Sequence, residues 1–453
     1  MIGIVVSEAD EASAHIGELL LDVGDFRRVG DGVYRTEGFE LREFGERHID
    51  IEDPAAAFDD PGFVVVVSRH AGDTGPLLTA HHTGNFGDAE YGGEDRSLAE
   101  ACPNAHKRVV AALAEHAPEG YQVGMECTHH GPTEVSAPSM FVEVGSAAEQ
   151  WRDPEGARAV AEAVLDLRGV DPHTERSLVA FGGGHYAPRP TRIVEETDWA
   201  VGHVAADWCL EDLGDPREHR DVVERAFDAS GAERAVVDGD RPAVEAVVDD
   251  LGYRVVSETW VRETDGVDLG LVDSLERHVA TVDDGLRFGD AAVGADPAEY
   301  VVVALPGTVL DAAHAADPDA AVAAASETAL AYRTEENGNR LTGTAAFADE
   351  AAYESFCDLL ADVLREDYDD VAREDGRLTA RREAFDPVAA TELGVPEGPK
   401  FGRLASGRSV EVDGHEVRPS DVAKTETVTV SLGLRERARE RVRRPSDAEG
   451  KGN

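Results

Sequence analysis

Apolar residues in the first half of the chain form short runs that alternate with segments of helical spacing. The unbroken apolar runs at residues 2–6 and 63–67 are typical of strands that are covered on both faces. Helical spacing predicts helices at residues 8–23, capped by Ser7, and at 154–167. Further strands are expected at residues 77–80, 121–127, 139–144 and 178–181. Strands that alternate with helices predict a doubly wound α/β sheet with mainly parallel strands.

The chain changes character after residue 262. It becomes rich in Ala, Asp and Glu, and strand-like runs mix with helical spacing as far as residue 385. A Gly-rich, strand-forming stretch and a basic run follow, and the charge spacing at residues 435–444 favours a helix. We expect a main domain over 1–262, an acidic α+β insert or extension over 263–385, and a Gly-rich segment with a basic tail over 386–453.

The formal net charge is −49 over 453 residues, and the acidic residues are spread over every segment. Concentrated salt screens such a surface, because the Debye length falls to about 3 Å at 1 M. We therefore interpret the charge as an adaptation to a salt-rich cell; the alternative is a protein that repels acidic partners. Disorder is disfavoured by a hydrophobic content of 42%.

The four cysteines show no CxxC spacing, which argues against a disulfide framework or a zinc ribbon. The start of the sequence has neither a basic region nor a long apolar segment. No run approaches the roughly 20 apolar residues that a membrane span requires. These features predict a cytoplasmic protein without a membrane partner.

Histidines follow directly after four of the predicted strands. Because α/β sheets bind ligands beyond the carboxyl ends of their strands, we expect these histidines to gather at one edge of the sheet. Imidazole groups bind zinc and move protons near neutral pH, so the gathering predicts a site of that chemistry. The histidines are His70, His81 with His82, His129 with His130, and His185.

The stretch MECTHHGPTE at residues 125–134 carries the densest chemistry. A Gly-Pro turn lets two successive histidines, His129 and His130, serve one site. Two carboxylates, Glu126 and Glu134, lie within reach as metal ligands, partners of a ligand or general bases. We favour a functional loop over the alternative, a pair of solvated histidines.

Alternation along the strand at 77–80 separates His81 from His82, because successive side chains of a strand point to opposite faces. We expect His81 to face the site as a metal ligand or catalytic base; the alternative is a histidine that is hydrogen-bonded in a turn. Glu143 is interpreted as an ordinary polar residue of the next strand. Cys127 is interpreted as a small buried residue, because nothing nearby would activate a thiolate.

A glycine run follows the strand at 178–181 and leads into His185. Its backbone N–H groups are candidates for holding a phosphate or an oxyanion. The run fits no dinucleotide-binding fingerprint, since no helix opens on a GxGxxG spacing. His203, further along, is a candidate metal ligand. The glycines are Gly182, Gly183 and Gly184.

Several common catalytic motifs do not occur: HExxH, GxSxG, the Walker A motif and the kinase set. A serine hydrolase is therefore disfavoured. Water that is activated by zinc or by a histidine fits the residues better.

At these residues the sequence resembles the archaeal, zinc-linked type of D-aminoacyl-tRNA deacylase. The matching motifs occur in the family's order over about residues 1–262. His82 stands where the family usually has an apolar residue, Cys127 stands where it has a small one, and the chain beyond residue 263 is additional. The motifs are SRH at 68–70, LTAHHTGNFG at 78–87, YGG at 91–93, ECTHHGPTEVSAPSMFVEVGSAAEQW at 126–151, GGGHYAP at 182–188 and GH at 202–203.

The resemblance implies zinc-assisted hydrolysis of the ester that joins a D-amino acid to the tRNA 3′ end. It also implies a three-layer α/β/α sandwich similar to peptidyl-tRNA hydrolases and nucleoside phosphorylases. As a hypothesis, Glu126 or Glu134 moves the proton and the three glycine amides stabilise the oxyanion. One or two zinc ions would be held by some of five histidines: His81, His129, His130, His185 and His203.

Binding of tRNA by a chain of this charge requires local cations. Arg69, Lys107 and Arg189 are candidates for a basic rim, and the run at 435–444 is a candidate for phosphate contacts or, alternatively, a solvated helix. We expect a monomer. Two other functions stay open on the residues alone: a zinc amidohydrolase or peptidase acting on small molecules, and a zinc- or tRNA-binding protein without turnover.

Overall fold

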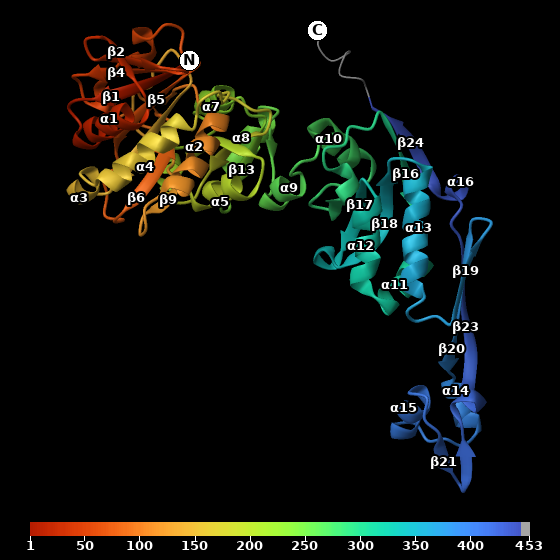
Figure 1. Cartoon of the computed structure of the whole chain (residues 1–453). Coiled ribbons are helices and arrows are strands. Elements are labelled where there is room, and N and C mark those ends of the chain that lie inside the picture. Colours follow the sequence, from red (N-terminus) through yellow and green to blue (C-terminus); the bar gives the residue numbers. More distant parts are fainter. Residues whose placement is uncertain (445–453) are drawn as a thin grey trace. The chain divides into compact units, whose positions relative to one another are not determined.

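The computed structural model describes residues 1–444, which belong to two compact units, Met1–Arg262 and a second unit that begins at Glu263 (Figure 1). The first unit is built on a mixed eight-stranded sheet. Its strands, in spatial order, are β2 (Arg27–Gly30), β3 (Val33–Thr36), β4 (Phe39–Phe44), β1 (Ile2–Ser7), β5 (Phe63–Arg69), β10 (Ser139–Gly145), β6 (Leu77–His81) and β9 (Gln122–Met125).

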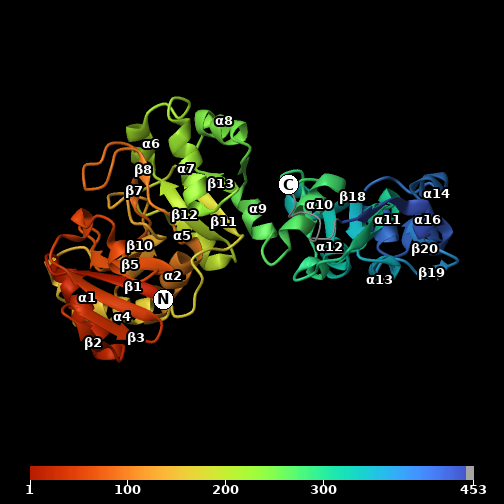
Figure 2. The ribbon, with the colours of Figure 1, turned by 90° about the horizontal axis from the view of Figure 1, so that it is seen from above.

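A second sheet of four parallel strands completes the first unit. Figure 2 shows it in yellow-green to green beside the red-to-yellow strands of the larger sheet. The loop after β9 joins the two sheets, because the Thr128 N–H donates to the Val204 carbonyl and the Cys127 N–H donates to the His185 carbonyl. The strands of this second sheet are β12 (Ala200–Ala205), β11 (Ser177–Phe181), β13 (Arg234–Val237) and β14 (Arg254–Val255). A separate short pair consists of β7 (Gly84–Asn85) and β8 (Ser97–Leu98).

Helices α1, α2 and α4 pack on one face of the large sheet, and α5 and α7 pack against β12. The α/β class that the sequence predicts is therefore present. The cap of α1 differs from the prediction: Asp10 accepts from the N–H groups of Ala12 and Ser13, while Ser7 ends strand β1. The helices are α1 (Glu11–Val23), α2 (Pro103–His116), α3 (Ala148–Trp151), α4 (Pro154–Leu165), α5 (Pro188–Glu196), α6 (Asp207–Leu213), α7 (Arg220–Ser230), α8 (Pro242–Asp250) and α9 (Glu258–Glu263).

The other face of the large sheet changes from apolar to polar along β5 and β10. Val66 and Phe141 are paired across the two strands and belong to a buried apolar cluster with Phe58. Two residues further along each strand, on the same face, Ser68 is paired with Glu143. Because the side chains of a strand alternate, the strand pattern alone brings this hydroxyl and this carboxylate together. The candidate site lies at this polar end.

The second unit contains a five-stranded antiparallel sheet covered by α11, α12 and α13. Its strands are β15 (Leu286–Phe288), β17 (Ala331–Glu335), β18 (Arg340–Phe347), β16 (Glu299–Ala304) and β24 (Ala438–Arg443), and a three-stranded sheet consists of β19 (Asp370–Glu374), β20 (Arg377–Phe385) and β23 (Ala423–Ser431). The remaining elements are α10 (Leu269–His278), α11 (Gly307–Ala316), α12 (Pro318–Thr328), α13 (Glu350–Leu364), α14 (Pro387–Glu392), α15 (Pro399–Ala405), β21 (Val410–Val412), β22 (His415–Val417) and α16 (Leu434–Arg437).

Strand pairing links the two C-terminal segments that the sequence separates at residue 385. β20 pairs with β23 along its whole length, and β24 pairs with β16. Residues 263–385 and 386–444 therefore contribute to the same sheets. The helix expected at 435–444 is wrong, because only Leu434–Arg437 is helical and the rest is strand β24. Residues 445–453 of the expected tail lie outside the described residues.

Within residues 1–444, none of the helices combines the length and the apolar character that crossing a bilayer would demand.

Candidate active site

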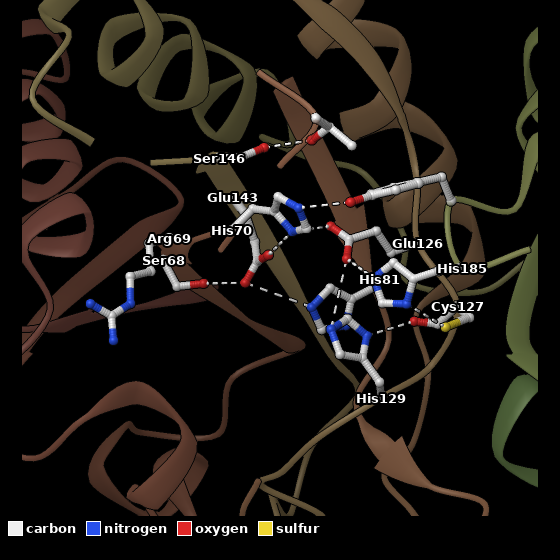
Figure 3. Close-up of polar contacts among 12 residues, drawn as sticks. Ser68, Arg69, His70, His81, Glu126, Cys127, His129, Glu143, Ser146 and His185 are labelled. Carbon is white, nitrogen blue, oxygen red and sulfur yellow. Dashed lines mark hydrogen bonds and ion pairs between the residues drawn. The ribbon is translucent and has the colours of Figure 1, made fainter. Parts of the chain in front are cut away.

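The site is organised around Glu143, a carboxylate in the middle of β10 that is 2% exposed. The Ser68 hydroxyl donates to Glu143 Oε1 at 2.7 Å. His70 Nδ1 and His81 Nε2 each lie 3.7 Å from a Glu143 oxygen (Figure 3). These contacts join three neighbouring strands, because Ser68 comes from β5, His81 from β6, and His70 directly follows β5.

The histidines meet over the face of β10 rather than at one edge of the sheet. The sequence predicts parallel strands whose carboxyl ends coincide, but β6 runs antiparallel to β10. His81, the last residue of β6, therefore lies opposite Phe141 near the start of β10. His70 extends from the other end, next to Val144. The predicted gathering occurs, and its predicted location is wrong because of this reversed strand.

A second carboxylate, Glu126, links three histidines at the end of β9. His185 Nε2 lies 2.7 Å from Glu126 Oε2, and His70 Nδ1 lies 3.0 Å from Oε1. His129 Nε2 lies 3.7 Å from the Oε2 atom. His70 Nε2 is in turn 3.2 Å from the Tyr186 hydroxyl. Glu126 is therefore bound by imidazoles on both sides in a buried position.

These contacts raise the pKa values of His70 and His185. Burial opposes the charge of His70, but hydrogen bonds with Glu126 and Glu143 outweigh it and raise its pKa to about 11. Burial also opposes the charge of His185, and hydrogen bonds with Cys127 and Glu126 raise its pKa to about 10. A hydrogen bond with Cys209 and burial raise the pKa of Cys127 to about 12. The thiol is therefore neutral, and Glu126 is the charged partner of His185.

The same contacts shift the pKa values of the two carboxylates, Glu126 and Glu143, downward. Burial alone would raise the pKa of each, but hydrogen bonds from His185 and His70 lower the pKa of Glu126. The hydrogen bond from His70 holds the pKa of Glu143 well below its ordinary value. Both groups are therefore anions at neutral pH.

The imidazoles of His81, His129 and His130 form the arrangement best suited to a metal ion. The Nδ1 atoms of His81, His129 and His130 each lie 2.9–3.0 Å from a backbone carbonyl oxygen. A carbonyl can only accept, so each Nδ1 carries the proton and each Nε2 keeps its lone pair. One ligand atom from each of the three lies within 4.8 Å of the others. Burial holds the pKa of His130 well below its ordinary value, which favours the neutral form that binds metals.

His82 and His203 lie on the opposite side of this strand end. His82 faces the buried His106, with ring centroids 4.5 Å apart, as strand alternation predicts. His203 Nδ1 lies 3.0 Å from the Thr128 hydroxyl, and its Nε2 lies 2.9 Å from the Ala99 carbonyl. The prediction of His203 as a metal ligand is therefore wrong, because both ring nitrogens already have protein partners.

Backbone N–H groups of the glycine run form hydrogen bonds within the fold. The Gly182 N–H donates to the Ala205 carbonyl, and the Gly183 N–H donates to Asp207 Oδ1 at 2.6 Å. The prediction that Gly182, Gly183 and Gly184 together form an oxyanion hole is wrong for the first two for this reason. The run instead turns the chain so that His185 reaches Glu126.

Glu134 also lies apart from the histidines. It is exposed and lines a different hollow with Asp50 and Glu52. The hollow that it lines includes no histidine, so the structure does not bring Glu134 to the cluster, where its predicted role as a catalytic carboxylate would place it. Glu126 is the carboxylate of the loop that meets the histidines.

The three predicted tRNA-binding cations have different positions. Arg69 stacks on Trp151 at 5.1 Å and lines the same cavity as His129 and His185. Lys107 donates to backbone carbonyls of Thr197 and Trp199, and it does not line that cavity. The Arg189 side chain is bound to Glu258 and to the Val237 carbonyl. The structure therefore brings only Arg69 to the histidine cluster.

Sequence reasoning missed the roles of Glu143 and Tyr186, and it placed His70 at the site without giving it a role. Glu143 had one visible signal: it is a charge inside the otherwise apolar run SMFVEVG. A charge in a fully covered strand needs a partner, because an unpaired buried carboxylate is costly. His70 and Tyr186 carried weaker signals, their positions next to a strand end and next to His185.

Comparison with known proteins finds one family that matches this part of the chain. The family model described as D-aminoacyl-tRNA deacylase matches residues 57–256, which include each histidine of the cluster. The D-aminoacyl-tRNA deacylase of Halobacterium salinarum is 61% identical over the full length of both chains. That of Halorubrum lacusprofundi is 53% identical over 94% of this chain and 96% of its own.

A solved structure supports the fold of the first unit. The crystal structure of "Conserved Protein of Unknown Function AF0625" shares 33% identity and a TM-score of 0.54. It covers 58% of this chain, and the match includes 98% of the other chain. With full-length relatives at 61% identity, the chain belongs to the D-aminoacyl-tRNA deacylase family.

Proposed function

We propose that the histidine cluster hydrolyses the ester between a D-amino acid and the tRNA 3′ end, with one zinc ion bound by His81, His129 and His130. Membership of the deacylase family supports the reaction. Two observations support the zinc assignment: one ligand atom of each of the three histidines lies within 4.8 Å of the others, and each Nδ1 atom lies against a backbone carbonyl. Three nitrogen ligands and an open position are typical of catalytic zinc.

Zinc bound there would lower the pKa of a coordinated water from about 15.7 toward about 7 and polarise the ester carbonyl. Glu126 accepts the proton that the attacking water gives up, since its Oε2 atom is 3.7 Å from His129 Nε2 and 2.7 Å from His185 Nε2. The Glu126–His185 pair then delivers a proton to the ribose oxygen as the carbon–oxygen bond breaks. The products are a free D-amino acid and tRNA with an intact 3′ end.

The charged imidazoles replace the glycine amides as stabilisers of the tetrahedral oxyanion. His70 and His185 have raised pKa values, about 11 and about 10, and therefore carry positive charge at neutral pH. Both line the cavity that contains His129 and Glu143. Positive groups held in place before the reaction stabilise developing negative charge most effectively.

The proposal includes the partner, the architecture and the cellular setting of the reaction. The tRNA is the partner, and Arg69 contacts its 3′-terminal phosphates from the edge of the cavity. The architecture that accompanies the activity is a three-layer α/β/α sandwich with an appended acidic α+β domain. The protein acts as a cytoplasmic monomer in a salt-rich cell.

Metal analysis with an activity assay tests the zinc assignment. The purified full chain should contain about one zinc per chain, the number that a single three-histidine site holds. His129→Ala should lose the zinc and slow hydrolysis of D-tyrosyl-tRNA by about 100-fold or more. The matched control is His173→Ala, which removes an exposed histidine and should change neither the zinc content nor the rate of hydrolysis. Full hydrolysis by His129→Ala, or by wild-type chains free of zinc, would contradict the proposal.

A further inference from the structure

Exposed aromatic side chains are concentrated at one place in the described chain. Among residues 1–444, the exposed large apolar side chains include three aromatic ones. The exposed fraction is 64% for Tyr91, 42% for Trp208 and 38% for Tyr186. All three lie beside the histidine cluster. Tyr186 contacts His70, Trp208 lies against His185, and Tyr91 lines the cavity formed by His129 and His130. Exposed aromatic groups that surround an active site suggest a flat ligand.

Tyr91 and Trp208 border one cavity of about 200 Å³, and His129 and His185 form part of its wall. This volume is below the roughly 300–1,000 Å³ of pockets for drug-sized ligands, so it suits a single ring system. Trp208 is held nearly parallel to the His185 ring, at 29° and a centroid distance of 6.4 Å. The Tyr91 carbonyl accepts from the Gly131 N–H at 3.1 Å, which holds its loop beside the catalytic turn.

The charge around this cavity indicates which part of a nucleotide fits. Apart from the His185 imidazolium, which is bound to Glu126, the charged residues in its wall are carboxylates, Asp88, Glu90 and Asp212. Arg96 lies 3.5 Å from Asp88 and balances one of them. Carboxylates repel phosphate, but they accept hydrogen bonds from the amino groups of cytosine and adenine. The cavity therefore favours nucleobases over the sugar-phosphate backbone.

Stacking is also the interaction that survives in concentrated salt. Phosphate contacts weaken steeply as salt rises, because their strength derives from the release of counterions. Contacts between aromatic rings and bases do not depend on charge, and salting-out ions strengthen the burial of apolar surface. A chain with a net charge of −49 has little attraction for phosphate at low salt. It therefore requires a means of holding tRNA that does not rely on charge.

We propose that Tyr91 and Trp208 form a stacking platform that binds the unpaired bases at the tRNA 3′ end. The platform shares His129 and His185 with the active site, so a base that stacks there brings its ribose ester beside the reacting groups. This inference rests on the proposed function for the identity of the nucleic acid. It assigns to these two side chains the recognition of single-stranded bases.

Fluorescence gives a readout that does not require turnover. The full chain in molar KCl is titrated with the trinucleotide CCA, and stacking on Trp208 should quench tryptophan emission. Trp208→Leu should abolish the quenching, and Tyr91→Ala should weaken CCA binding by about 10-fold. Val29→Ala, which removes an exposed apolar side chain of β2, is the matched control and should bind as the wild type does. Ribose 5-phosphate, which has no base, should not quench.

Kinetics on D-tyrosyl-tRNA separate binding from chemistry. Trp208→Leu should raise KM by about 10-fold with kcat nearly unchanged, and Trp208→Phe should restore most of the affinity. Unchanged CCA affinity and KM in Trp208→Leu would overturn the platform, as would a change in amino-acid preference without a change in CCA binding. If the wild type bound CCA through Trp208 but hydrolysed no D-aminoacyl-tRNA, the proposed function would fail while the platform stood.

Discussion

Glu143 is a single buried charge that connects the catalytic groups. It lies in a strand whose other residues are also buried, where an unpaired carboxylate would be strongly destabilising. The Ser68 hydroxyl and the imidazoles of His70 and His81 stabilise its charged form. The same contacts fix the rotation of both rings. We infer that Glu143 positions the histidines and does not itself contact the substrate.

Glu143→Gln should separate this positioning role from folding. The amide keeps the size of the side chain but removes the charge that orients His70 and His81. We expect kcat on D-tyrosyl-tRNA to fall by about 10–100-fold with little change in KM. Hydrolysis assays stopped at timed intervals measure kcat and KM, and circular dichroism checks that the chain is folded. Glu149→Gln, an exposed neighbour, is the control. A wild-type kcat in Glu143→Gln would show that Glu143 does not position the catalytic histidines.

The residues that could be predicted from sequence are those whose chemistry is visible locally. His129 and His130 directly precede a glycine-proline turn, and Glu126 is three or four positions before them. The proximity of these three side chains can therefore be predicted without knowledge of the fold. Glu143 could not be assigned in this way, because its partners are 62 to 75 positions distant in the sequence and are brought together only by the register of β5, β10 and β6. His203 was misjudged for the same reason: nothing local indicates that Thr128 and Ala99 occupy its ring nitrogens.

At the scale of elements, the end of β6 divides two groups of histidines. His81 joins the active site, and His82 joins the buried rings of His106 and His203. Burial opposes the charged form of these rings and lowers the pKa of both His106 and His203 to about 4. Each ring is therefore neutral in the folded chain over most of the accessible pH range.

This buried group predicts how stability depends on pH. In the unfolded chain such histidines bind protons as the pH falls through about 6.5, whereas in the fold they stay neutral until about 4. The stability that His106 and His203 contribute is therefore complete above about pH 6.5 and is lost as the pH drops from there to about 4. Linkage gives a loss on the order of 3 kcal/mol for each ring.

His106→Phe removes one of these titrating rings and keeps a planar side chain. Thermal unfolding between pH 7 and 5, in molar salt, should show a shallower loss of stability than in the wild type. Within this range the carboxylates of the active site stay charged and contribute little. His173→Phe, which removes an exposed histidine, should keep the wild-type slope. An equally steep loss in His106→Phe would mean that its ring does not titrate as described.

Strand β24 illustrates where local patterns fail. The opposite charges spaced three residues apart at 435–444 fit a helix, yet Ala438–Arg443 is a strand. β16 offers an unpaired edge, and Val442, opposite Tyr300, is buried there. The charge pattern holds no information about that edge. Arg444 pairs instead with Asp268 and Asp296, which are distant in the sequence.

For the molecule as a whole, the proposed active site belongs to the first unit. The family match spans residues 57–256, and the related crystal structure is covered almost entirely by 58% of this chain. α9 must be retained in any shortened chain, because Trp260 packs on Trp199 at 5.3 Å. A chain of residues 1–266 should therefore fold and hydrolyse D-tyrosyl-tRNA within about 10-fold of the full-length kcat. A folded but inactive 1–266 would place part of the chemistry in the second unit.

The proposed reaction is hydrolysis of the ester of D-aminoacyl-tRNA in one histidine-lined cavity that holds zinc. It is tested by single-turnover release of D-tyrosine and of L-tyrosine from tRNA, in molar KCl with and without a chelator. We expect rapid release of D-tyrosine, much slower release of L-tyrosine, and loss of the rapid phase on chelation that added zinc restores. Equal rates for the two enantiomers, or full activity after the metal is removed, would contradict it.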